Sequence, residues 1–216
     1  MPPGPVLHEE DAGIDLYWLP LGAGDASRSV RLSGRVYEAL AARRDDRPAR
    51  QLYHSALEVR LGGDRFVIEM VPAWGGPRAE RGVVGHGPVG LARLGRSRFF
   101  RYEVRRWRNG CIPDLSWAVG EAQHPDSDVR RVQRLLELVP AFPTATWGRD
   151  ELRTGDMWNS NSLISWLLTR SGHDTDLLRP PLLGRAPGWN AGLLVAARHA
   201  GTVSMSGRRT SPAKAR

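Results

Sequence analysis

Two stretches of alternating apolar and polar residues, joined by a pair of glycines, constrain this chain more than any other feature. Side chains alternate between the two faces of a β-strand, and a Gly-Gly pair between two such stretches is a strong hairpin signal. The pattern therefore predicts a β-hairpin with a two-residue loop at Gly62 and Gly63, in which Leu57 faces Ile68. The residues that then share one face are the apolar Leu57, Val59, Phe66, Ile68 and Met70, together with Ser55.

The same register places two ionisable residues on one face of the hairpin. His54 becomes a diagonal neighbour of Glu69, and diagonal neighbours lie about 7–8 Å apart at Cα, within reach of an imidazole and a carboxylate. A loop shifted to Gly63 and Asp64 keeps them on one face but further apart. A histidine oriented by a carboxylate has the form of a general base. Structural pairs of this kind are common, so the pair alone favours a structural role.

The rest of the chain predicts an α+β fold, a small antiparallel sheet packed against helices. We expect a flexible N-terminus at residues 1–12, a single domain at 13–206 and a disordered basic tail at 207–216. Within the domain, the patterns predict strands at 14–21 and 98–107, helices at 34–44, 124–139 and 160–170, and a long glycine-rich loop at 73–95.

Composition narrows the class of protein further. Of the 216 residues, 41% are hydrophobic, which is enough for a sizeable core. No apolar run approaches the roughly 18 residues that a membrane span needs. The first residues show no basic region followed by an apolar run, so we expect no secretory signal. The single cysteine, Cys111, excludes an internal disulfide and a multi-cysteine zinc site. We therefore expect a cytoplasmic protein without a metal or cofactor.

The formal net charge of +8 raises the possibility of nucleic-acid binding. Lys214 is the only lysine among 31 basic residues, a bias typical of a GC-rich coding sequence rather than of a phosphate-binding surface. Residues 98–108 interleave arginines with aromatic residues, as a single-strand platform does. A strand with inward aromatics and solvated arginines explains the alternation equally, and we favour it. These arginines could still bind an anionic group of a substrate.

A polar run, Trp158-Asn159-Ser160-Asn161-Ser162, opens the helix predicted at 160–170. Asn and Ser are preferred N-cap residues because their side chains accept hydrogen bonds from unpaired amides, so capping is the favoured interpretation. The functional interpretation is a nucleophile at the helix N-terminus, where backbone amides can bind an oxyanion. A serine there needs a general base such as His54, and the sequence leaves Ser160 and Ser162 open as the exposed hydroxyl.

Four segments resemble the circularly permuted papain-like families, namely the PPPDE peptidases and the lecithin:retinol acyltransferase family with its NlpC-like relatives. Residues 14–21 resemble the opening strand, and 53–59 the strand that carries the catalytic histidine. Residues 67–72 resemble the next strand, which bears a second polar catalytic residue, and 158–161 resemble the Asn-Cys-Asn segment of the last catalytic helix. The resemblance implies a permuted papain-like topology.

The resemblance also implies roles for individual residues. His54 is then the base, Glu69 the orienting residue and Ser160 the nucleophile, with serine in place of the family's cysteine and Cys111 outside the motif. The implied function is a hydrolase or acyltransferase acting on an amide, ester or thioester of a small-molecule, lipid or peptide substrate. The alternatives are a catalytically degenerate binding scaffold and, third, a nucleic-acid-binding protein. The candidate substrate-binding residues are Trp158, Asn159, Asn161 and Ser162.

Overall fold

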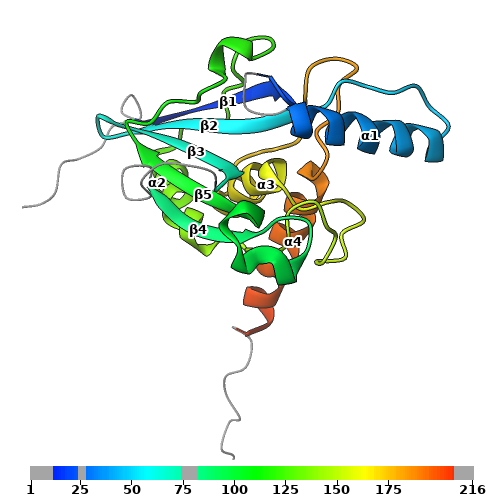
Figure 1. Ribbon diagram of the computed structural model, residues 1–216. Coiled ribbons are helices and arrows are strands. Elements are labelled where there is room, and N and C mark those ends of the chain that lie inside the picture. Colours follow the sequence, from blue (N-terminus) through cyan, green and yellow to red (C-terminus); the bar gives the residue numbers. More distant parts are fainter. Residues whose placement is uncertain (1–11, 24–27, 74–81, 207–216) are drawn as a thin grey trace, which may run out of the picture.

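The computed structural model describes residues 12–23, 28–73 and 82–206 (Figure 1). Five strands form one antiparallel sheet in the order β1-β2-β3-β5-β4. The α+β class predicted from the sequence is confirmed. The strands are β1 (Ala12–Pro20), β2 (Tyr53–Leu61), β3 (Asp64–Pro72), β4 (Val83–Pro88) and β5 (Arg101–Arg108), and the helices are α1 (Arg28–Arg44), α2 (Val129–Leu138), α3 (Ser160–Ser171) and α4 (Trp189–Ser206).

The hairpin of β2 and β3 has the predicted register. Leu57 pairs with Ile68 and Leu61 pairs with Asp64, which leaves Gly62 and Gly63 as a two-residue turn. Both glycines have positive φ, 59° and 82°, the conformation that this type of tight turn requires at its two central residues.

Strands β2 and β3 separate over nearly half of their length. The pairing of β2 with β3 runs from the turn only as far as Leu57 and Ile68, although the strands continue to Tyr53 and Pro72. The outer partners stay attached, because β1 pairs with β2 through Tyr53 and β5 pairs with β3 through Pro72. The sheet therefore opens in its middle, at the end where His54 and Glu69 lie.

Apolar residues on the two faces of the sheet form two separate clusters. The larger cluster joins one face of the sheet to α2, α3 and α4, which Figure 1 shows gathered on one side. The smaller cluster, on the other face, is covered by the segment around Ile112 and Ala118. Sheet residues of the large cluster include Leu16, Leu57, Val59, Ile68, Met70 and Val104, and those of the small one are Leu19, Ala56 and Val67.

Two elements were missed by sequence patterns. The predicted loop at 73–95 contains β4, an edge strand whose glycines and terminal proline hide its extended conformation. Gly87 is required there, because a Cβ at this position would lie 2.4 Å from the Tyr102 hydroxyl oxygen. The apolar run at 193–197 belongs to the long helix α4.

Element boundaries shift by a few residues elsewhere. The strand predicted from residue 98 begins at Arg101 after a short 3-10 turn, and Ala12, placed in the flexible start, is the first residue of β1. The helix predicted from residue 124 begins at Val129, since Asp128 caps it by accepting a hydrogen bond from the Arg131 amide, 2.9 Å. Residues 1–11 and 207–216 lie outside the described residues. Among the described helices, none has the length and apolar character needed to cross a bilayer.

Candidate functional site

A cavity of about 380 Å³ lies where β2 and β3 separate. Its polar lining includes His54 from β2, Glu69 from β3 and Ser160 from the start of α3, three residues that are far apart in the sequence. Most of the remaining lining is apolar, so the cavity combines a few polar groups with apolar walls, as small-molecule sites do. The apolar lining residues are Leu21, Ala56, Met70, Val71, Pro72, Ile112, Pro113 and Trp147.

Strand alternation assigns the lining residues to different faces of the sheet. Ser55 shares the face of Leu57, towards α3, where its hydroxyl donates a hydrogen bond to Asn161 Oδ1, 2.8 Å. His54 lies on the opposite face of the strand, as Glu69 does on β3. These residues line one cavity together with Ser160 because the gap between β2 and β3 is open to both faces.

Ser160 and Ser162 differ in what their hydroxyl groups bind. Ser162 Oγ donates to the Gly188 carbonyl, 2.8 Å, and accepts a hydrogen bond from the Asn159 amide, 3.1 Å. Ser160 lines the cavity, and its hydroxyl has no hydrogen-bond partner among the described residues. Of the two serines left open by the sequence, Ser160 is therefore the one that faces the cavity with a hydroxyl free to react.

Asn161 attaches the first turn of α3 to the rest of the protein. Its amide nitrogen donates to the carbonyls of Tyr53 and Pro187, at 2.9 and 2.8 Å, and its oxygen accepts from Ser55. The side chain is fully buried and all of its polar atoms are occupied. Asn161 therefore fixes the position of Ser160 next to β2 without lining the cavity.

Asn159 caps α3 by accepting hydrogen bonds from two backbone amides of the first helical turn. Its Oδ1 accepts hydrogen bonds from the amides of Asn161, 2.9 Å, and Ser162, 3.4 Å, while Ser162 completes a capping box. The capping interpretation of the sequence is confirmed. Among the first-turn amides, that of Ser160 has no hydrogen-bond partner in the described part of the chain.

Trp158 belongs to the core. Its ring stacks on Phe142 with centroids 4.9 Å apart, and its Nε1 donates to the Pro143 carbonyl, 3.0 Å. The side chain is buried and does not line the cavity. Together with Asn159, Asn161 and Ser162, it forms the support of the helix start rather than the wall that a ligand would touch.

His54 is half-buried and makes no hydrogen bond with any described residue. Burial lowers the pKa of its imidazole from 6.5 to about 4. The ring is therefore neutral at physiological pH, the form that accepts a proton.

Glu69 pairs with an arginine that sequence reasoning did not assign to the site. Arg105 lies directly opposite Glu69 in the β3–β5 register and donates from Nη1 to Glu69 Oε1, 2.8 Å. It also contacts Glu103 Oε2, 3.1 Å from Nη2, and all three side chains are buried. Because β3 and β5 are not consecutive in the chain, no local pattern brings these residues together. Arg105 is occupied by carboxylates, so it is not the anion-binding arginine considered from the sequence.

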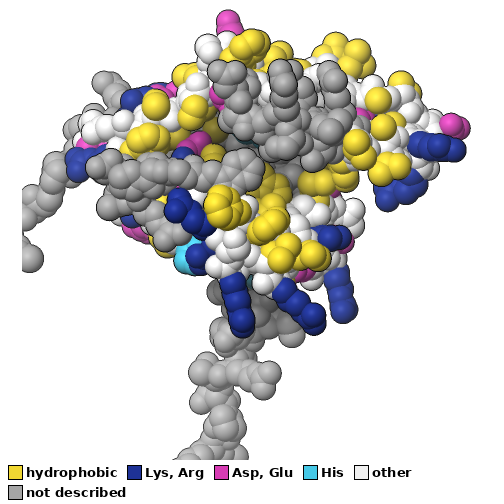
Figure 2. All heavy atoms as spheres, viewed as in Figure 1, with side chains coloured by type: hydrophobic (Ala, Val, Ile, Leu, Met, Phe, Trp, Pro, Cys, Tyr) yellow, Lys and Arg dark blue, Asp and Glu magenta, His cyan; other side chains and the backbone are white. Residues whose placement is uncertain are grey.

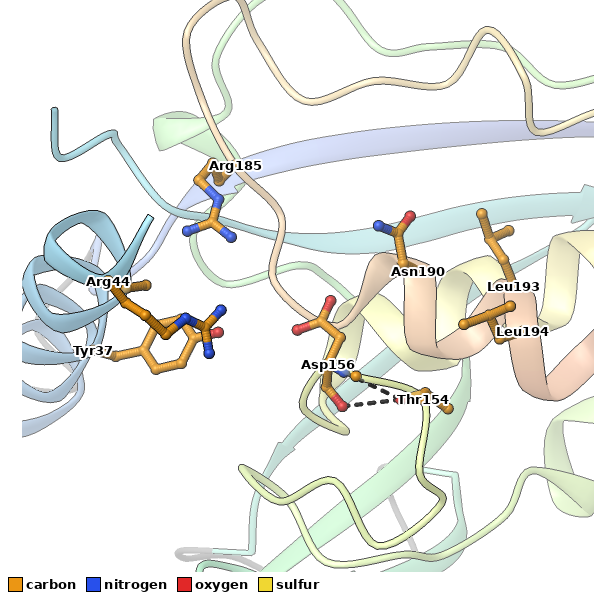
Figure 3. A pocket seen from close by; sticks show the side chains of 10 residues that line it. Tyr37, Arg44, Thr154, Asp156, Arg185, Asn190, Leu193 and Leu194 are labelled. Atoms are coloured by element: carbon orange, nitrogen blue, oxygen red, sulfur yellow. Dashed lines mark hydrogen bonds between the residues drawn. The ribbon is translucent and has the colours of Figure 1, made fainter. Parts of the chain in front are cut away.

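A second cavity, of about 440 Å³, lies between the C-terminal part of α1 and the start of α4 (Figure 3). Its lining includes Tyr37, Arg44, Asp156, Arg185 and Asn190. Asp156 accepts hydrogen bonds from two backbone amides within this region, and burial raises the pKa of its carboxyl.

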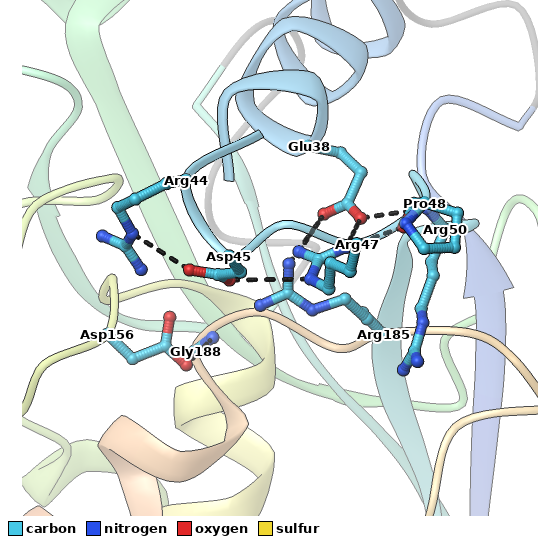
Figure 4. A network of polar contacts seen from close by, with 9 residues as sticks. All are labelled: Glu38, Arg44, Asp45, Arg47, Pro48, Arg50, Asp156, Arg185 and Gly188. Carbon is cyan, nitrogen blue, oxygen red and sulfur yellow. Dashed lines mark hydrogen bonds and ion pairs between the residues drawn. The ribbon is translucent and has the colours of Figure 1, made fainter. Parts of the chain in front are cut away.

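The charges beside this second cavity are satisfied by one another (Figure 4). Buried Glu38 binds Arg47, 2.6 Å, Arg185, 2.7 Å, and the Arg50 amide, 2.9 Å. Burial by itself raises the pKa of Glu38, but these hydrogen bonds and the charge of Arg185 lower it below its ordinary value. The network attaches α1, which projects from one end of the sheet in Figure 1, to the loop before α4.

Cys111 is exposed and does not line the first cavity, although Ile112 and Pro113 beside it do. Within the described ranges, no cluster of three His, Cys, Asp or Glu side chains is placed to hold a metal ion. No known protein family, curated protein or solved structure matches this chain.

Proposed function

We propose that the chain is a hydrolase or acyltransferase in which Ser160 is the nucleophile and His54 the general base. One observation carries the proposal: the Ser160 hydroxyl and the His54 imidazole line the same cavity, and neither is hydrogen-bonded to any described residue. Both residues line the cavity, so their unpaired polar groups are accessible to a ligand that enters it. The resemblance to permuted papain-like proteins supports the same two residues.

The reaction follows from the groups in the cavity. Ser160 Oγ attacks the carbonyl carbon of an ester, amide or thioester while its proton passes to the His54 imidazole. The Ser160 amide donates a hydrogen bond to the oxyanion. Collapse of the intermediate breaks the bond to the leaving group, which takes the proton from His54. Water or an acceptor alcohol or amine then releases the acyl group by the same steps in reverse.

The cavity lining favours an uncharged acyl group. Met70, Ile112 and Trp147 provide apolar walls, and Arg105 is neutralised by its two carboxylates. Glu69 is the proposed orienting group, with Arg105 holding its carboxylate at the cavity. A pKa of about 4 leaves His54 a weak base, so we expect slow turnover.

A non-catalytic binding protein is the second candidate. The observation that favours it is the Glu69–Arg105 pair, because the imidazole of His54 receives no hydrogen bond from Glu69. A cytoplasmic location stays a prediction, and nucleic-acid binding, the third class, predicts a salt-dependent interaction with a mixed DNA or RNA probe.

Covalent labelling with a fluorophosphonate tests the proposal. We expect one adduct, which intact mass and peptide mapping place on Ser160, and a loss of labelling of at least about 100-fold in Ser160→Ala and His54→Gln. Ser162→Ala is the matched control. In the wild-type protein the Ser162 hydroxyl donates a hydrogen bond to the Gly188 carbonyl, so the adduct on Ser160 should persist in this variant. Circular dichroism establishes that each variant is folded.

Two outcomes contradict the catalytic proposal. An adduct on another residue, or no adduct under conditions that label a control serine hydrolase, assigns the cavity to binding alone. In that case Ser160→Ala should bind an apolar ligand as tightly as the wild-type protein does.

A further inference from the structure

Residues 91–100, between β4 and β5, expose large apolar side chains. They form two 3-10 turns, at Ala92–Arg96 and Arg98–Phe100, in which no side chain is buried. Figure 2 shows hydrophobic side chains gathered on this face with basic ones projecting beside them. Exposed apolar side chains that cluster in this way mark interaction sites. The exposed fractions are 54% for Leu91, 40% for Leu94, 69% for Phe99 and 44% for Phe100.

The same segment carries three exposed positive charges. Arg93, Arg96 and Arg98 are exposed, and none forms an ion pair with a described residue. Residues 82–102 contain no Asp or Glu. Aromatic and leucine side chains among arginines are the composition of a surface that lies in the headgroup region of an anionic membrane.

The segment is held firmly to the sheet beside the first cavity. Trp147, which lines that cavity, forms a bridge with Val89 and accepts a hydrogen bond from the Gly90 amide, 2.9 Å. Gly95 packs on Pro88 so closely that a Cβ would lie 2.7 Å from the proline Cβ. The apolar surface is therefore presented by a fixed element next to the cavity.

A second exposed apolar group provides the contrast. Leu177, Leu182 and Leu183 are exposed, but Asp174 and Asp176 precede them in the chain. The nearby arginines are occupied, Arg179 by backbone carbonyls and Arg185 by Glu38. Apolar exposure at this second site therefore comes with carboxylates nearby in the chain, unlike that of residues 91–100.

We propose that residues 91–100 dock the protein on an anionic lipid surface, with Leu94 and Phe99 inserted between headgroups and Arg93, Arg96 and Arg98 contacting their phosphates. This surface would place the first cavity next to the membrane, where acyl chains are available. The docking itself does not depend on the reaction of Ser160.

Flotation of the full-length protein with lipid vesicles measures the charge part of the proposal. We expect binding to vesicles of phosphatidylcholine mixed with phosphatidylglycerol and little binding to phosphatidylcholine alone. Each basic residue at such a surface contributes roughly fivefold in affinity, so Arg93→Gln, Arg96→Gln and Arg98→Gln together should weaken binding by about 100-fold.

The apolar part has a matched control. Leu94→Ser combined with Phe99→Ser should lower vesicle binding at least about tenfold, because both side chains lose their insertion into the headgroup region. Leu182→Ser combined with Leu183→Ser removes leucines that are more exposed than Leu94 and Phe99 from the other site and should leave binding unchanged. All four positions are exposed, so the variants should fold as the wild-type protein does.

Three results would overturn the proposal. The first is no binding of the wild-type protein to anionic vesicles. The second is full binding by the triple arginine variant with loss in Arg208→Gln combined with Arg209→Gln, which would assign the effect to the C-terminal residues. The third is preferential binding of a mixed single-stranded oligonucleotide over vesicles, abolished by the triple arginine variant. Labelling of Ser160, with or without vesicles, is a separate measurement and tests only the reaction.

Discussion

The two cavities are of similar size but differ in particular ionisable groups, because the His54 imidazole at the first is unpaired whereas Asp156 at the second and Glu38 beside it are hydrogen-bonded. In the first, between β2 and β3, the Ser160 hydroxyl and the His54 imidazole have no hydrogen-bond partner among the described residues. Beside the second, below α1, Glu38 has three partners and Asp156 two. Polar groups that are satisfied internally stabilise a fold, whereas unsatisfied ones are available to a ligand.

The difference teaches which cavity to associate with function. Charged residues gather more densely at the second cavity, so charge alone would indicate the second cavity as the functional site. Their mutual pairing assigns them instead to holding α1 in place (Figure 4). Mutations should therefore affect stability at the second cavity and chemistry at the first.

The largest expected difference in stability comes from Glu38→Ala. The change removes four hydrogen bonds and leaves Arg185 half-buried without its carboxylate, so we expect a loss of about 2 to 3 kcal/mol in the free energy of unfolding. Ser160→Ala, at the first cavity, should change it by less than about 0.5 kcal/mol, since no described contact is lost. Urea denaturation of both variants and the wild-type protein provides the comparison.

A result in the other direction would break the comparison. If Ser160→Ala destabilises the protein as much as Glu38→Ala does, the Ser160 hydroxyl makes stabilising contacts. It would then have a structural role and would not be available to a ligand in the first cavity.

The sequence predicts the hairpin well because its information is local. Alternation of apolar residues around Gly62 and Gly63 fixes the register, which in turn places His54 and Glu69 on one face. The run at the start of α3 is equally local, since Asn159 and its neighbours cap a helix wherever they occur.

Contacts between distant segments could not be predicted in this way. Strand β5 pairs with β3 as well as with β4, the strand that precedes it in the chain. The contact of Arg105 with Glu69 therefore follows from the order of strands in the sheet. The separation of β2 from β3 beyond Leu57 is also a tertiary effect. Without it His54 and Ser160, on different faces of the sheet, would not line one cavity.

The pH dependence of stability sharpens the comparison further. Unfolded His54 has a pKa near 6.5 and folded His54 a pKa of about 4, so below pH 6.5 only the unfolded chain takes up the proton. The contribution of neutral His54 to the free energy of unfolding is fully present above pH 6.5 and decreases as the pH is lowered towards 4. Each pKa unit corresponds to about 1.4 kcal/mol, and partial exposure to the cavity reduces the effect, so we expect a loss of about 1 to 2 kcal/mol by pH 5.

Glu38, beside the second cavity, titrates in a lower pH range than His54 does. The pKa of Glu38 is below its ordinary value, so its contribution is present above about pH 4.5 and is lost as the pH falls through the folded pKa. Burial also lowers the pKa of His173, so in thermal denaturation between pH 7 and 5 His54→Gln should reduce the slope of the curve while Glu38→Gln should not. Equal slopes in His54→Gln and the wild-type protein would contradict the assignment.

The smallest expected effect separates the two serines of α3. Ser162→Ala removes one half of the capping box and the hydrogen bond from Ser162 Oγ to the Gly188 carbonyl, so we expect a loss of about 1 kcal/mol in the free energy of unfolding. Ser160→Ala, two positions earlier on the same helix turn, removes no described hydrogen bond. Denaturation of the two variants under identical conditions measures the difference, and equal stabilities would mean that both hydroxyls are bound alike. We expect Ser160→Ala to be as stable as the wild-type protein but not to react with a fluorophosphonate. We expect Ser162→Ala to be less stable but still to react. This result would assign a chemical role to Ser160 and a structural role to Ser162.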